Sequence, residues 1–132
     1  GRRFIWIEGN HDPDLPAFLP GESRSDFTLN GLYFTHQVTA ETELRNGLIS
    51  GHYHPKARVN LKLRRISVPC FIEDRRHLIL PAFGTFTGGL NVLDKAIQSV
   101  LITPQSAYLC HAGKIYHLPV TTRFFLKNST LR

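Results

Sequence analysis

Gly47-Leu48-Ile49-Ser50-Gly51-His52-Tyr53-His54-Pro55 is a short apolar stretch that runs into a loop with two histidines. In an extended backbone, side chains two residues apart leave on the same face, so His52 and His54 can point into one pocket while Tyr53 turns away. Gly51 allows the backbone to turn sharply. The spacing suits two metal ions lying side by side, each taking one imidazole. A pair of surface histidines with no ligand is the alternative that this loop alone leaves open.

A second polar cluster follows Phe4-Ile5-Trp6-Ile7, which we predict to be a buried strand. Both clusters therefore come at the carboxyl end of an apolar strand, where α/β sheets place their sites. In this cluster, the Asn10 carbonyl oxygen suits a divalent ion. His11 can donate a proton or stabilise an oxyanion, and Asp12 can orient that imidazole. An Asx turn followed by an exposed His11 and Asp12 is the alternative for this stretch alone.

Taken together, Gly9-Asn10-His11-Asp12 and the later Gly51-His52-Tyr53-His54 are more specific than either string alone. A third string, Leu32-Tyr33-Phe34-Thr35-His36, supplies a lone histidine at the end of a strand between them. These strings resemble three signature motifs of the calcineurin-like metallophosphoesterases. Further runs resemble the bacterial ligase-associated DNA-repair branch of that superfamily: Pro69-Cys70-Phe71, Leu78-Ile79-Leu80-Pro81-Ala82-Phe83-Gly84 and Phe86-Thr87-Gly88-Gly89. The resemblance covers residues 4–120.

The resemblance implies a role for each residue that matches a motif. The implied metal ligands are Asn10, His36 and His52 for one ion and His54 for the second. His11 would stabilise the leaving oxygen, with Asp12 behind it. The implied cofactors are two divalent metal ions, with manganese expected and iron or zinc as alternatives. The family also uses an Asp-x-His motif and a Gly-Asp motif, and neither string occurs in this sequence.

The expected fold is a strand-rich α/β fold, the C-terminal half of a layered metallophosphoesterase β-sandwich flanked by helices. The chain has no Met, and its first apolar stretch begins at Phe4. We therefore expect residues 1–120 to be the C-terminal part of a calcineurin-like phosphoesterase domain and residues 121–132 to be a C-terminal tail. Such a half-domain exposes sheet edges, which invite aggregation. We expect the missing N-terminal half or an oligomer partner to cover them.

The net charge of +6 and the pI near 9.8 suit a polyanionic partner such as nucleic acid. The basic residues are scattered along the chain, so a merely soluble basic surface is the alternative. Cys70 and Cys110 both lie inside apolar strand patterns, which favours reduced thiols in a cytoplasmic protein. The sequence has no signal peptide and no apolar run near the length of a membrane span. We expect no membrane partner.

Two hairpins and one helical turn are predicted from turn chemistry. Asn30-Gly31 is a strong two-residue hairpin signal that joins strands at residues 26–29 and 32–35 and delivers His36. Ala112-Gly113 is predicted to close a last hairpin, with His111 and His117 on the strand surface. Residues 94–98 are predicted to form one helical turn.

The alternation of apolar residues from Arg58 onward indicates a strand, but its phase slips before Ile66. We interpret the slip as a β-bulge at Arg64-Arg65. A charged turn at residues 73–76 should lead into another strand, where His77 is predicted to be structural or exposed. The Gly-rich residues 84–89 could hold a phosphate, although the alternative that their glycines simply allow a turn is favoured.

Two classes of function remain open. In the first, the chain belongs to a metal-dependent phosphoesterase that hydrolyses phosphodiester or phosphomonoester bonds, with nucleic acid in DNA repair as a candidate substrate. Because the chain offers only part of the ligand set that two metal ions need, the chain alone should bind metal poorly and be inactive. In the second, it is a non-catalytic binding or structural module that retains a partial metal site. The presence or absence of Asp-x-His and Gly-Asp upstream of Gly1 would separate the two.

Overall fold

A computed structural model of the chain describes residues 1–10, 16–61, 64–84 and 87–121. The described part contains ten short strands and one helical turn, so the prediction of a strand-rich α/β fold is confirmed. The strands are β1 (Ile5–Ile7), β2 (Glu22–Arg24), β3 (Asp26–Leu29), β4 (Leu32–Thr35), β5 (Leu48–Ser50), β6 (Lys56–Leu61), β7 (Arg64–Glu73), β8 (His77–Ile79), β9 (Ser106–His111) and β10 (Lys114–Pro119). The helix is α1 (Lys95–Gln98).

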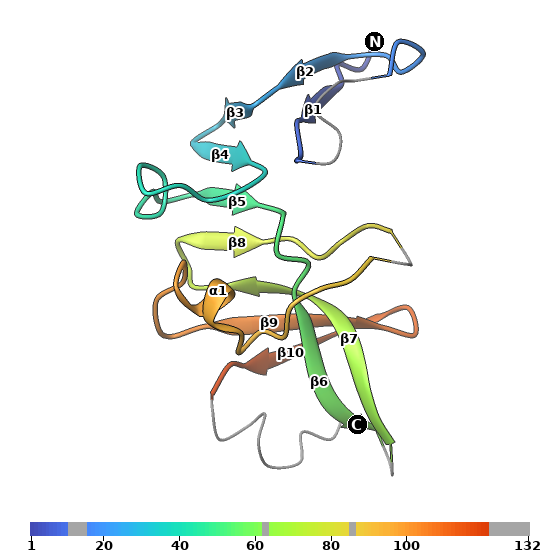
Figure 1. Cartoon of the computed structure of the whole chain (residues 1–132), viewed down its shortest axis with the longest axis vertical. Helices are drawn as coiled ribbons and strands as arrows, with labels where there is room; N and C mark the ends of the chain where they lie inside the picture. The colour runs from blue at the N-terminus through green and yellow to red at the C-terminus, as the bar shows by residue number, and fades with distance from the viewer. Residues whose placement is uncertain (11–15, 62–63, 85–86, 122–132) are drawn as a thin grey trace.

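The main sheet is mixed and runs in the order β10-β9-β7-β8-β5-β4-β3 (Figure 1). Parallel pairing joins β4 to β5 and β5 to β8, and the other neighbours in this order are antiparallel. The first part of β7 pairs with β6, and its last residues pair with β8 and β9. β1 pairs with β2 in a separate two-stranded sheet.

The core lies on one face of the main sheet. Ile72 of β7 pairs with Ile79 of β8 and with Ala107 of β9, so these side chains share that face, and all three are fully buried. The segment around α1 packs on this face through its buried side chains Val92 and Ile97. Asp94 caps α1 by accepting a hydrogen bond from the Ala96 N–H.

Two of the three turn predictions concern hairpins, and both are confirmed. Asn30 and Gly31 adopt positive φ angles of 49° and 82° between β3 and β4, as a two-residue hairpin turn requires. Ala112 and Gly113 do the same between β9 and β10, at 49° and 71°. The predicted helical turn is α1.

The interpretation of the phase slip as a β-bulge at Arg64-Arg65 is wrong. Leu61 pairs with Arg64 in an antiparallel register, so the chain reverses there and β6 and β7 form a hairpin. A hairpin and a bulge both shift the phase of the apolar alternation along the chain, because the turn residues of a hairpin or the extra residue of a bulge interrupt the period of two. The arm formed by β6 and β7 extends away from the rest of the sheet (Figure 1).

The prediction of a buried strand at residues 4–7 is wrong in its burial. The strand β1 is present, but Phe4 is 46% and Trp6 39% exposed. The pairing of β1 with β2 leaves both without a place in the main sheet, so the core face does not cover them. Within the described residues, no helix is long and apolar enough to cross a membrane.

Candidate metal centre

Two adjacent parallel strands deliver two of the candidate histidines to the same edge of the sheet. Thr35, the last residue of β4, pairs with Ser50, the last residue of β5. His36 therefore follows one strand at the point where Gly51 and His52 follow the other. The Gly51 N–H donates to the His36 carbonyl oxygen at 3.0 Å, which extends the pairing into the loop. This is the strand-end placement that the sequence indicates for both residues.

His36 and His52 face each other across this edge. His52 Nδ1 lies 3.3 Å from His36 Nε2, and the rings are 5.2 Å apart and nearly perpendicular. Two imidazole nitrogens that each lie about 2.1 Å from one ion, at a tetrahedral angle, are about 3.4 Å apart. The observed separation therefore fits two ligands of a common metal ion. It equally fits a hydrogen bond between the rings, with one of the two nitrogens protonated.

Gly9 brings the N-terminal polar cluster against His36. A Cβ atom on Gly9 would lie 3.2 Å from His36 Cε1 and 3.3 Å from Nδ1, so the glycine backbone packs directly on the imidazole. Asn10 is the next residue and is exposed. The structure thus brings the end of the Asn10 cluster to the His36–His52 pair. His11 and Asp12, the predicted catalytic residues, lie outside the described residues.

The loop that carries His52 and His54 is not extended, so that part of the prediction is wrong. Both histidines adopt left-handed backbone conformations, with φ of 66° and 47°. The Tyr53 N–H donates to the Gly51 carbonyl oxygen at 2.8 Å, which closes a tight turn. Strained residues of this kind cluster at functional sites. The same-face rule for extended chains therefore does not describe this loop.

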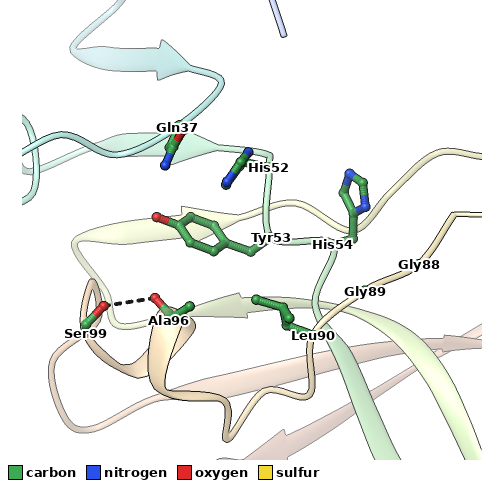
Figure 2. Close-up of a pocket in the computed structure, with 9 residues that line it drawn as sticks. All are labelled: Gln37, His52, Tyr53, His54, Gly88, Gly89, Leu90, Ala96 and Ser99. Carbon is green, nitrogen blue, oxygen red and sulfur yellow. Dashed lines mark hydrogen bonds between the residues drawn. The ribbon is translucent and has the colours of Figure 1, made fainter. Parts of the chain in front are cut away.

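Figure 2 shows the His52 ring near Gln37 and the His54 ring apart from it along the loop. The predicted second ligand position is thus separate from the His36–His52 pair. Among the residues that the structure describes, no group of three or more His, Cys, Asp or Glu side chains is placed to hold a metal ion. His36 and His52 are the described pair whose nitrogen spacing fits one ion, and the roles of Asn10 and His54 as ligands stay predictions.

Tyr53 is a residue whose role the sequence pattern missed. The alternation of an extended strand predicts that Tyr53 points away from the pocket. Instead, Tyr53 is 8% exposed, and its ring lies 5.1 Å from the His52 ring in an edge-to-face contact. Burial raises the pKa of the Tyr53 hydroxyl. A large aromatic residue between two candidate ligands was the available signal, since such residues commonly fix loop geometry by packing.

A pocket of about 490 Å³ lies beside this loop (Figure 2). It is lined by Gln37, His52, Tyr53, His54, Gly88, Gly89, Leu90, Ala96 and Ser99. The Gly-rich stretch forms one wall. A Cβ atom on Gly89 would lie 2.3 Å from the His54 carbonyl oxygen, so only glycine allows this approach. The requirement at Gly89 is thus close packing against the histidine loop.

His77, in contrast, is a structural histidine, as predicted. It is 1% exposed, and its Nε2 lies 2.8 Å from Ser50 Oγ. Its Nδ1 lies 3.4 Å from the Val100 carbonyl oxygen. Burial lowers the pKa of His77, which keeps the ring neutral. Both ring nitrogens are used inside the fold, so this histidine does not contribute to the candidate centre.

Comparison with solved structures shows what the fold and site are similar to. The crystal structure of the Pseudomonas putida nuclease MPE matches with a TM-score of 0.66 and 28% sequence identity. The match covers 88% of this chain and 53% of the nuclease chain, so this chain spans about half the length of that protein. The fold is therefore nuclease-like. No protein-family model and no curated protein sequence matches the chain.

Proposed function

We propose that this chain is part of a metal-dependent phosphoesterase that hydrolyses phosphodiester bonds in nucleic acid. The observation that carries the proposal is the 3.3 Å separation of His36 Nε2 and His52 Nδ1 at the ends of two adjacent parallel strands. The N-terminal polar cluster that contains Asn10 packs against the same imidazole through Gly9. The similarity to a nuclease and the net charge of +6 support nucleic acid as the substrate.

Asn10, His36 and His52 would hold one divalent ion, and His54 would help to hold a second. We expect manganese, as the family resemblance implies, with iron or zinc as alternatives, since imidazole suits iron and zinc and a carbonyl oxygen suits manganese. When bound, such ions polarise the phosphoryl group and offset its charge. The parallel pairing of β4 with β5 would keep the two ring nitrogens of His36 and His52 at ligand spacing. Gly9 would leave the His36 ring room to adopt its position.

His11 is proposed to stabilise charge on the leaving oxygen, and Asp12 to orient its imidazole. These roles rest on the motif alone, since both residues lie outside the described part of the chain. We also propose a role in DNA repair, because the sequence resembles the ligase-associated DNA-repair branch of the superfamily. Cys70 and Cys110 are free thiols, which suits the reducing environment of the cytoplasm.

The test uses the full-length protein, by which we mean the longest natural polypeptide that contains these residues. It is assayed with a generic bis-aryl phosphodiester, with added manganese and with a chelator. We expect metal-dependent turnover that His52→Ala abolishes together with bound metal. His117→Ala is the matched control, because His117 stacks on Tyr108 at 4.9 Å in the last hairpin. Turnover that is unaffected by chelation would refute the proposal.

A non-catalytic module with a partial metal site is the second candidate. It is favoured by the finding that the described residues assemble no group of three or more His, Cys, Asp or Glu ligands. This candidate predicts metal binding without turnover in the full-length protein. Metal content and hydrolysis, measured on the same preparation, separate the two candidates.

A further inference from the structure

The hydroxyl group of Tyr53 is the polar end of a ring that is packed beside the candidate metal centre. The ring is held by its contact with His52, and the backbone on both sides is hydrogen-bonded, since Tyr53 N–H donates to Gly51 and its carbonyl oxygen accepts from Leu90 N–H. The residue as a whole is 8% exposed. Within the described residues, the buried side-chain atoms without a hydrogen-bond partner are Arg76 Nε and Nη1, so Tyr53 Oη is not an orphaned buried group. A phenolic hydroxyl of this kind can both donate and accept hydrogen bonds.

The hydroxyl belongs to the wall of the 490 Å³ pocket. Figure 2 shows the Tyr53 ring lying along the pocket, with its hydroxyl end on the same side as Gln37 and Ser99. The Gln37 side chain is exposed and can donate and accept hydrogen bonds. The volume falls in the range of roughly 300–1,000 Å³ that small-molecule sites occupy. The pocket therefore has the size and the polar groups of a ligand site.

The chemistry of the lining disfavours a second phosphate as the natural occupant. None of the nine lining residues is Asp, Glu, Lys or Arg. The nearby Lys56 ammonium group is engaged, since Nζ donates to the Thr87 carbonyl oxygen at 2.9 Å. Phosphate sites use cationic side chains or clusters of backbone N–H groups. The hydroxyl and amide groups, together with Leu90 and Ala96, instead suit an uncharged group with polar edges and an apolar face.

We propose that this pocket binds the nucleoside attached to the scissile phosphate, and that the Tyr53 hydroxyl and the Gln37 amide contact the hydrogen-bonding edge of its base. The inference rests on the proposed function, because His52 and His54 line the same pocket and would place the phosphate at its mouth. Tyr53 is then a specificity-determining residue. It recognises the organic part of the substrate and not the phosphate.

The first experiment compares two phosphodiesters in the full-length protein. The p-nitrophenyl esters of thymidylate and of methyl phosphate have the same leaving group and the same charge, and only the first carries a nucleoside. We expect Tyr53→Phe to raise KM for the thymidylate ester by about 2- to 10-fold relative to the methyl ester, as the loss of one hydrogen bond implies. Ala96→Leu fills the pocket from α1 without altering Tyr53, and it should weaken the same preference. Equal effects of both variants on both esters would overturn the inference.

The second experiment measures binding without turnover. Thymidine carries no phosphate, so its binding to the full-length protein, followed by saturation-transfer NMR, requires neither metal nor hydrolysis. We expect Tyr53→Phe and Ala96→Leu to weaken it, while the matched control Tyr108→Phe leaves it unchanged. Thermal unfolding of each variant shows that the fold is retained. If thymidine binding depends on Tyr53 but the protein shows no metal-dependent turnover, the proposed function is refuted and the nucleoside-binding role of the pocket stands. If the protein shows metal-dependent turnover but thymidine does not bind, or binds equally well to Tyr53→Phe, the nucleoside-binding role is refuted and the proposed function stands.

Discussion

The chain contains two regions that differ in burial: an open region, residues 1–37, and a closed region, residues 48–120. Within the described residues, no side chain of the open region is fully buried, and every buried apolar residue lies at Val38 or later. Three of the large exposed apolar side chains of the open region are Phe4, Trp6 and Phe18. The closed region has a continuous core on one face of its sheet. The described part of the open region has no core of its own, so it depends on contacts with other elements.

The candidate metal centre lies on the boundary between these regions. Asn10 and His36 belong to the open region, whereas His52 and His54 belong to the closed one. Contacts across the boundary include the pairing of β4 with β5, the Gly51–His36 hydrogen bond and the His36–His52 contact. The geometry of the site therefore depends on how firmly the open region is held against the closed one. This difference predicts where substitutions should and should not affect stability.

The largest loss of stability is expected for Ile72→Ala in the closed region. Ile72 is fully buried between its sheet neighbours, and removing a buried isoleucine side chain costs about 2–5 kcal/mol of unfolding free energy. Ile115→Ala is the matched control, because Ile115 is 67% exposed on β10. Its effect should stay within about 0.5 kcal/mol. Denaturant unfolding followed by circular dichroism measures both, and equal losses would show that the core has been misplaced.

The next largest loss of unfolding free energy, about 1–3 kcal/mol, is expected for Asp74→Asn. The buried Asp74 carboxylate accepts from the N–H groups of His77 at 2.7 Å, Ile102 at 2.9 Å and Arg76 at 3.0 Å. It also accepts from the Arg76 guanidinium group at 3.1 Å. An amide offers one acceptor oxygen in place of two, so some of these donors lose their partner.

The exposed Glu41 serves as the control for this change, since Glu41→Gln removes the same charge from a surface position. If both substitutions change the unfolding free energy equally, net charge and not the hydrogen-bond network accounts for the effect. The network would then contribute nothing measurable to the closed region.

A smaller change in unfolding free energy is expected when the pH is varied. Burial lowers the pKa of His77, so the folded state does not take up a proton at a pH where the unfolded chain does. Stability should therefore be complete above the ordinary histidine pKa of about 6.5 and should fall as the pH drops below it. Burial raises the pKa of Asp74, but hydrogen bonds from Ile102, His77 and Arg76 outweigh this and lower it. Its contribution should be lost only as the pH falls below about 3.9.

The two groups are separated by their pH windows. Unfolding free energies measured between pH 5 and 8, in wild type and His77→Gln, isolate the histidine contribution. The variant should show a weaker dependence on pH in this window. A dependence identical to that of wild type would mean that His77 is not held neutral by the fold.

The sequence predicted those parts of the fold that depend on local chemistry. Asn30-Gly31 fixes a hairpin because both residues tolerate positive φ, and this holds whatever the rest of the chain does. The prediction of a bulge at Arg64-Arg65 is wrong because the apolar phase of a strand does not reveal which segment pairs with it. The prediction that Trp6 is buried is wrong because burial depends on which elements cover a strand. Only the Trp6 error concerns contacts between distant segments, because Leu61 and Arg64 pair across a short turn.

The candidate site divides in the same way. The residue types in the motifs are legible in the sequence, and the strand-end placement of His36 and His52 follows from the pairing of β4 with β5. The left-handed backbone at His52 and His54 was not predictable from an alternating pattern, because a tight turn replaces the extended geometry. The Gly89 contact with His54 joins residues far apart in the chain, and no local pattern reports it.

The smallest effect on overall stability is expected at Trp6, the single tryptophan of the chain. Its indole N–H donates to the Pro20 carbonyl oxygen at 2.9 Å, but the side chain is 39% exposed and lies outside the core. Trp6→Phe should therefore change the unfolding free energy measured by circular dichroism by no more than about 0.5 kcal/mol. In the unsubstituted chain, tryptophan fluorescence reports the open region, and circular dichroism reports mainly the strands of the closed region.

If the open region is held only at the boundary, its local opening requires less free energy than unfolding of the core. The fluorescence transition should then come at a lower denaturant concentration than the circular dichroism transition, in contrast to a two-state protein, in which the two coincide. Coincident transitions would show that the chain unfolds as one cooperative unit. The pairing of β4 with β5 would then couple the regions fully, and the Asn10 and His36 side of the site would be as firmly held as the His52 side.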